Sequence, residues 1–243
     1  HFLVQTDAPP ELALDATLDL ERAYLTFYKI LGKPLGLYVF DELPEIDIFA
    51  DSKDFPAPPT PGRSAWFSFA ANTLFVNASG KPNRGDIVAE LVDALIYNSF
   101  RRTLDKRSGE IEAWAREGLR QAFAGAVRPN PGRVRFDFET PLTAHFQGQA
   151  ADAKPLSLEQ VLRAGFASFD SGTDAPRYVA QAYTLTHFLA FAGQGKYRAA
   201  YATFLKDSYL GKGGASNFAK AVGVDAKTLE TEWTAYVKKM AGA

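Results

Sequence analysis

Cysteine is absent from this 243-residue chain, and histidine is scarce, with three copies. The absence of cysteine excludes disulfides, a thiol nucleophile and any metal site built on cysteine. No apolar run reaches the roughly 18 residues that a membrane-spanning helix needs. The net charge of −1, with both signs interspersed, offers no basic surface to nucleic acid. We therefore expect a soluble protein with no membrane span and no nucleic-acid partner.

The composition is that of a globular protein, with 47% hydrophobic and 23% charged residues. The aromatic side chains, 19 Phe, 10 Tyr and 3 Trp, can fill a substantial core. We predict one domain over residues 1–243. Because the chain begins at His1 directly in a strand-like run, we also expect that a segment upstream was removed.

Strand-like segments gather before residue 82. They are Phe2–Thr6, Leu37–Phe40, Ile46–Ala50, Ala65–Phe69 and Thr73–Asn77. A helix that enters through Pro9 and Pro10 and ends near Gly32 separates the first two.

The remainder is predicted to be mainly helical. Residues 126–155 are expected to form a loop with one short strand at Val134–Phe138. Helices are expected at 83–102, Glu110–Ala124, from Ser157 onward, Pro176–Ala192, Lys196–Tyr209, Ala215–Val222 and Ala226–Met240. The fold class is therefore α+β: a sheet-containing part at 1–82, a helix pair at 83–125 and a mainly helical part at 126–243.

The helix at 83–102 contains an anomaly. Its middle is apolar nearly all round, which is typical of a helix buried on several sides. Glu90 and Asp93 nevertheless lie within it, three residues apart and so on one face. In the next helix Glu117 precedes Gly118, a small residue that allows close helix approach. Buried carboxylates are costly unless paired, hydrogen-bonded or bound to a cation, so something must compensate these three.

Two explanations fit these acids. One is a structural ion-pair network with nearby arginines, for which the candidates are Arg101, Arg102, Arg116 and Arg120. The other is a remnant or altered active site. The local pattern leaves both open.

The order of several motifs resembles a bacterial peptidase-MA-like family of unknown function, which is gluzincin-like. Ala89-Glu90-Leu91-Val92-Asp93 followed by Trp114-Ala115-Arg116-Glu117-Gly118 is similar to the gluzincin pattern HExxH followed by WxxEG. Further similarity lies in three stretches: the start at His1–Asp7, the run Ala71–Asn77, and Tyr178–Tyr183 with Thr186–Leu189. The resemblance implies a zincin-like fold and, from the family alone, a bacterial, extracytoplasmic protein.

In that family the two histidines and the second glutamate bind zinc, and the first glutamate is the general base. By position, Glu90 matches the base and Glu117 the third ligand, whereas Ala89 and Asp93 replace the histidines. Since Ala89 offers no ligand, we expect no zinc and no metal site of the family's kind. Asp93 and Glu117 are oxygen ligands better suited to Ca²⁺ or Mg²⁺.

The remaining candidates are weaker. His145 lies in the predicted loop, and nothing around it indicates a ligand. His187 lies in an apolar helix, where a core histidine with a backbone partner is the default expectation. By resemblance Tyr178 lines the family's cleft, although core packing is its simpler role.

The first prediction is thus a catalytically inactive, metallopeptidase-like domain with a binding or structural role. The unknown partner would be a protein, a peptide or a glycan. The alternative is a hydrolase of altered chemistry, in which Glu90, Asp93 and Glu117 act with or without a non-zinc cation. A third hypothesis is an active zinc peptidase with an unrecognised ligand set.

Overall fold

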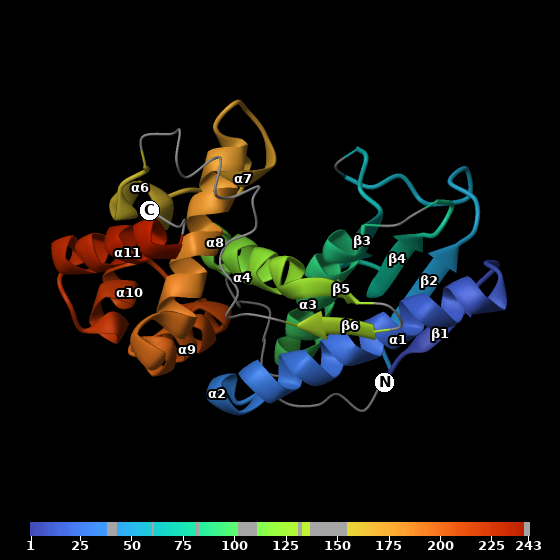
Figure 1. Ribbon diagram of the computed structural model, residues 1–243, viewed down its shortest axis with the longest axis horizontal. Coiled ribbons are helices and arrows are strands. Elements are labelled where there is room, and N and C mark those ends of the chain that lie inside the picture. The colour runs from blue at the N-terminus through green and yellow to red at the C-terminus, as the bar shows by residue number, and fades with distance from the viewer. Residues whose placement is uncertain are drawn as a thin grey trace. The chain divides into compact units, whose positions relative to one another are not determined.

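The computed structural model describes residues 1–37, 43–59, 61–80, 83–101, 111–130, 133–136 and 155–240 (Figure 1). The chain divides into two compact units. Unit 1 comprises the described residues of 1–102 and 126–137, and unit 2 those of 103–125 and 138–243. The single gluzincin-like domain predicted over 1–243 stays a prediction.

Unit 1 contains a four-stranded mixed sheet in the order β1-β2-β4-β3. Its strands are β1 (Leu3–Thr6), β2 (Glu45–Phe49), β3 (Ala65–Ser68) and β4 (Thr73–Asn77). β1, β2 and β4 are parallel, and β3 runs antiparallel to β4 at one edge. These strands confirm the sheet predicted before residue 82. In the predicted strand Leu37–Phe40, Leu37 is not in a strand, and 38–40 lie outside the described residues.

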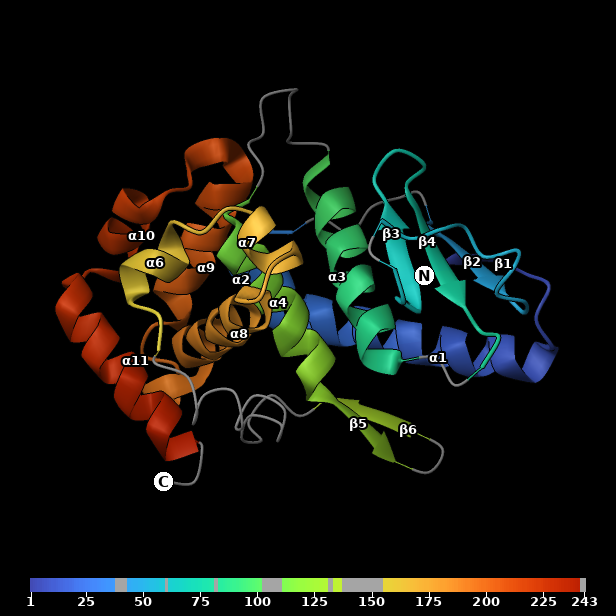
Figure 2. The same cartoon turned by 90° about the horizontal axis from the view of Figure 1, so that it is seen from above.

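Two long helices accompany this sheet. α1 (Pro10–Phe27) continues through a π-helical turn (Tyr28–Gly32) into α2 (Lys33–Leu35). α3 (Arg84–Arg101) follows Asn83, whose Oδ1 accepts the N–H of Gly85 at 3.0 Å and so caps the helix. α3 packs against α1, β3 and β4, and Figure 2 shows it beside β3. α3 is therefore the helix that positions Glu90 and Asp93.

The segment after α4 (Ala113–Ala126) differs from the prediction. β5 (Val127–Asn130) and β6 (Arg133–Phe136) pair as an antiparallel hairpin, where one short strand in a loop was expected. Pro129 and Pro131 favoured a loop, but proline is compatible with a two-stranded ribbon, in which each strand has an unpaired edge. The rest of the predicted loop up to 154 lies outside the described residues.

The described part of unit 2 is helical. Its helices are α4 (Ala113–Ala126, of which Ala126 is assigned to unit 1), α6 (Leu158–Leu162), α7 (Ala167–Asp170), α8 (Ala175–Phe191), α9 (Arg198–Asp207), α10 (Ala215–Val222) and α11 (Ala226–Met240), with short helical turns at Ala192–Gln194 and Ser208–Lys212. Trp114 of α4 stacks on Phe204 of α9 with ring centroids 5.6 Å apart, and Phe218 of α10 closes the cluster. A capping box at Ser157 and Gln160 starts α6 as expected.

The fold class is α+β, with a small mixed sheet and a mostly helical remainder, which confirms that part of the prediction. Among the described helices, none combines the length and the apolar character needed to cross a bilayer.

Candidate functional site

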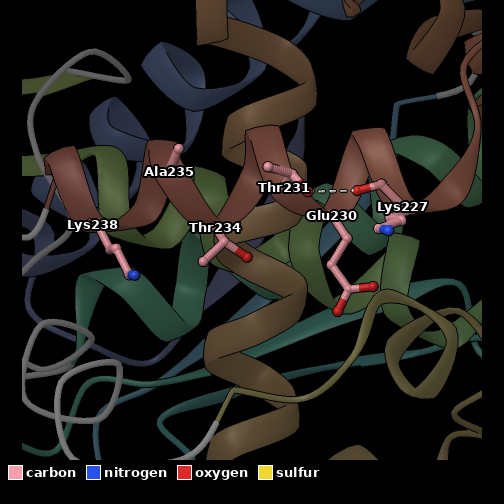
Figure 3. A pocket seen from close by; sticks show the side chains of 6 residues that line it. All are labelled: Lys227, Glu230, Thr231, Thr234, Ala235 and Lys238. Carbon is pink, nitrogen blue, oxygen red and sulfur yellow. Dashed lines mark hydrogen bonds between the residues drawn. The ribbon is translucent and has the colours of Figure 1, made fainter.

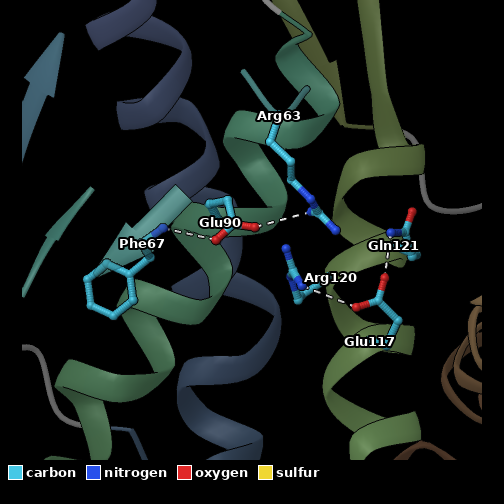
Figure 4. Close-up of polar contacts among 6 residues, drawn as sticks. All are labelled: Arg63, Phe67, Glu90, Glu117, Arg120 and Gln121. Atoms are coloured by element: carbon cyan, nitrogen blue, oxygen red, sulfur yellow. Dashed lines mark hydrogen bonds and ion pairs between the residues drawn. The ribbon is translucent and has the colours of Figure 1, made fainter. Parts of the chain in front are cut away.

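Glu90 is buried on α3 and accepts hydrogen bonds at both carboxylate oxygens (Figure 4). Its Oε1 atom accepts from Arg63 Nη1 at 3.3 Å, and its Oε2 atom accepts from the backbone N–H of Phe67 at 3.0 Å. Phe67 lies in β3, at the edge of the sheet. The carboxylate therefore links α3 to an edge strand and to the segment that precedes it.

Asp93 and Ala89, which the resemblance aligns with the two histidines of the gluzincin pattern, are both buried on α3. Asp93 is 5% exposed and Ala89 is 3% exposed. Their flanking residues Val88, Leu91 and Val92 are also buried. The burial that the apolar pattern predicted for Glu90 and Asp93 is thus confirmed.

Glu117, on α4 of unit 2, is buried and paired within its own helix (Figure 4). Its Oε2 atom accepts from Arg120 Nη1 at 3.2 Å, and its Oε1 atom accepts from Gln121 Nε2 at 2.7 Å. Arg120 is itself only 6% exposed. A buried carboxylate next to a buried guanidinium is compensated in charge, as the network explanation requires.

Gly118 allows close helix approach, and the helix it approaches is α8. A Cβ atom at Gly118 would lie 2.2 Å from Thr186 Oγ1 and 2.5 Å from the carbonyl oxygen of Ala182. No side chain larger than hydrogen fits there while the two backbones keep their distance. The residue after Glu117 therefore sets the packing of α4 on α8.

The predicted convergence of the three acids involves both units, since Glu90 and Asp93 lie in unit 1 and Glu117 in unit 2. It stays a prediction. Among the residues that the structure describes, no group of three or more His, Asp or Glu side chains is placed to hold a metal ion.

The ion-pair partners agree with the network explanation only in part. Arg120 was among the predicted arginines and pairs with Glu117. Arg63 was not, because it precedes β3 in a loop where no helical spacing ties it to Glu90. Arg116 lies over the ring of Phe166 at 5.5 Å. The Arg101 side chain and Arg102 lie outside the described residues.

Two of the three histidines are described. The ring of His1 stacks on Tyr24 and its Nδ1 lies 2.5 Å from Glu21 Oε2. His187 is buried on α8, as expected, but its Nδ1 lies 2.8 Å from the side-chain Oη of Tyr236 where a backbone partner was predicted. Burial raises the pKa of Tyr236 to about 12, so this hydroxyl stays protonated at neutral pH. His145 lies outside the described residues.

Tyr178 lines a hollow in unit 2 of about 400 Å³. The other lining residues come from α6, from α7 and from the segment between them: Glu159, Gln160, Arg163, Ala164, Gly165 and Ser168. The Tyr178 ring is half-buried and meets Phe169 edge-on, with centroids 5.7 Å apart. Tyr178 therefore packs against Phe169 and also lines this hollow.

A second hollow of about 470 Å³ follows one face of α11 (Figure 3). It is lined by Lys227, Glu230, Thr231, Thr234, Ala235 and Lys238. The Thr231 hydroxyl donates to the carbonyl of Lys227 at 2.8 Å, which turns it back onto the helix. No sequence pattern indicated this hollow, because its residues form an ordinary polar helix face.

The fold and the site together define an α+β protein whose sheet-flanking helix carries two buried carboxylates. No protein-family model matches the chain, and no curated protein matches it. The gluzincin resemblance accordingly depends on the order and spacing of the motifs alone.

Proposed function

We propose that this chain is a catalytically inactive, metallopeptidase-like domain with a binding or structural role. In this proposal Glu90, at the position of the general base, holds α3 against β3. The observation that carries the proposal is the pair of hydrogen bonds from Arg63 and the Phe67 N–H to the two oxygens of Glu90.

The contacts of Glu90 are poorly suited to base catalysis. A general base must reach a water molecule and take its proton. Here one oxygen is bonded to a main-chain amide and the other faces a guanidinium, in a side chain that is 7% exposed. A proton taken up by Glu90 would compete with one of these donors.

The neighbouring positions support the same reading. Zinc catalysis requires three protein ligands and an open position for water. Ala89 carries only a methyl group, and it is buried among apolar residues. The helix that would supply two imidazoles supplies a methyl group and a carboxylate.

Metal content tests this proposal. Protein purified without chelator is expected to contain no stoichiometric zinc by elemental analysis, and one zinc per chain would overturn the proposal. Replacing both Ala89 and Asp93 with His restores the two missing imidazoles. Zinc uptake by that double variant, with none by wild type, would show that the ancestral ligand geometry survives in an inactive site.

A second candidate is a hydrolase of altered chemistry that uses Glu90, Asp93 and Glu117. The observation in its favour is that all three acids are buried, and that two of them lie one turn apart on α3. A cation held by them would bind only the folded state, so Ca²⁺ or Mg²⁺ would raise the melting temperature. A rise that Asp93→Asn abolishes would favour this candidate over the first.

A further inference from the structure

The sheet of unit 1 has one face that its helices leave half-exposed, which we call the outer face. Along β2, Ile46 and Ile48 are buried, whereas the alternate residues Glu45, Asp47 and Phe49 are half-buried. The register aligns the outer-face residues in a row across the four strands, in the order Gln5, Asp47, Phe75 and Trp66. This row places a carboxylate directly beside aromatic rings.

Asp47 has a carboxylate oxygen whose hydrogen-bonding capacity is unused. Its Oδ1 atom is buried, and none of the described residues donates a hydrogen bond to it. Burial, followed by the negative charge of Glu45, raises the pKa of Asp47. Glu45 is itself engaged, since it accepts from Gln5 Nε2 and, at 3.4 Å, from the hydroxyl of Thr73. Among the described residues, no ion pair offsets the negative charge of Glu45 and Asp47 on the outer face.

The rings beside Asp47 form a fixed surface. Trp66 and Phe75 have centroids 4.9 Å apart, and Phe49 lies 6.2 Å from Phe75. The indole N–H of Trp66 donates to the carbonyl of Pro56 at 3.0 Å, which holds the ring in place. All three rings are half-buried, so part of each is accessible.

We propose that the outer face binds an arginine side chain of a basic peptide segment. In this arrangement Asp47 is the anionic partner and the ring of Phe75, backed by Trp66, is the stacking surface. A guanidinium meets both requirements, because its planar fork donates to a carboxylate while its face stacks on an aromatic ring. A neutral ligand would supply donors but leave the charge of Asp47 and Glu45 unbalanced.

This proposal does not depend on the role of Glu90. The side chains of Phe67 and Leu74, on the opposite face of β3 and β4, are buried on the α3 side of the sheet. An active or an inactive Glu90 would leave the outer face unchanged, so failure of one proposal leaves the other standing.

A short peptide tests the proposal. The probe is acetyl-Gly-Arg-Gly-Arg-Gly-amide, and its control replaces each arginine with citrulline, which is neutral and of nearly equal shape. Binding to the full chain is measured by calorimetry at low salt and followed by tryptophan fluorescence. Trp66 is the half-exposed member of the three tryptophans, since Trp114 and Trp233 are buried.

We expect the arginine peptide to bind and to change the Trp66 signal, and the citrulline peptide to bind at least about tenfold more weakly. Asp47→Asn is expected to weaken binding by about tenfold, whereas Glu11→Gln, which removes an exposed acid from α1, is expected to leave it unchanged. Absence of binding, equal affinity for both peptides, or full affinity in a folded Asp47→Asn variant would each overturn the proposal. Equal binding of the neutral peptide would point instead to an uncharged polar ligand.

Discussion

The Oε2 atom of Glu90 accepts the backbone N–H of Phe67 at 3.0 Å, so a helix side chain bonds the main chain of an edge strand. Arg63 compensates the charge of the same carboxylate from the segment before that strand. Glu90 thereby links two elements that are separated in sequence. Because of this relationship, we expect a substitution of Glu90 to change the stability of the folded protein.

Glu90→Gln is expected to lower the free energy of unfolding by about 1 to 3 kcal/mol. The amide can still accept from Phe67, but it loses the ion pair and can turn an N–H₂ group toward Arg63. Chemical denaturation of the variant and wild type measures the difference.

The matched control is Glu159→Gln, whose ion pair with Arg163 is largely exposed. It should change stability by less than about 0.5 kcal/mol. The structural role of Glu90 would be contradicted by one result: a Glu90→Gln variant that is as stable as wild type but lacks a hydrolytic activity that wild type shows.

Gly118→Ala is expected to destabilise the protein by about 3 kcal/mol or more, because the new Cβ would overlap the main chain of α8. The nearest backbone atom, the carbonyl oxygen of Ala182, would lie 2.5 Å away. Gly165→Ala is the control, since a Cβ there meets no atom within 4 Å. Thermal unfolding of both variants tests the comparison, and equal melting temperatures would show that α4 and α8 are not packed this closely.

Asp47→Asn is expected to stabilise the protein at neutral pH by up to about 1 kcal/mol, because it removes a partly buried charge. The pKa of Asp47 is raised in the folded state by burial and by Glu45. The folded state therefore binds a proton on the Asp47 carboxyl more tightly than the unfolded state does. The stability that this protonated carboxyl contributes is lost as pH rises through the folded pKa of Asp47.

The advantage of Asn over Asp should accordingly shrink between pH 7 and pH 4 in denaturation experiments. Asp54→Asn, at an exposed loop position, should change stability by less than about 0.5 kcal/mol at either pH. If the Asp47→Asn variant is less stable than wild type at pH 7, the burial of Asp47 and the nearby charge of Glu45 do not destabilise the folded state as argued.

Tyr236→Phe is expected to make stability less sensitive to alkaline pH. Burial raises the pKa of Tyr236 to about 12 from an ordinary value of 10.0. The contribution of its protonated hydroxyl is complete below pH 10 and is lost as pH rises toward the folded pKa. Melting temperatures between pH 9 and pH 11 should fall more steeply for wild type than for the variant. If melting temperature falls equally with pH in both proteins, the protonated hydroxyl of Tyr236 makes no such contribution to stability.

The sequence alone determined the strands of the sheet, most helix positions and the burial of Glu90 and Asp93. These features depend on local periodicity. A helix that is apolar on nearly all sides is buried in any fold, and a carboxylate within it is buried too. The capping box at Ser157 is local in the same sense. The missed strand β5 shows where local signals mislead, because its proline indicated a loop.

The tertiary structure decided the partners. Arg63 and Phe67 lie 27 and 23 residues before Glu90, and no periodicity relates them to it. Likewise Gly118 indicated a close helix approach, but only packing made α8 the helix in contact. The position of Asp47 beside Phe75 also required the strand register. Contacts between distant segments depend on how whole elements pack, whereas burial and helix ends depend on neighbours within a few residues.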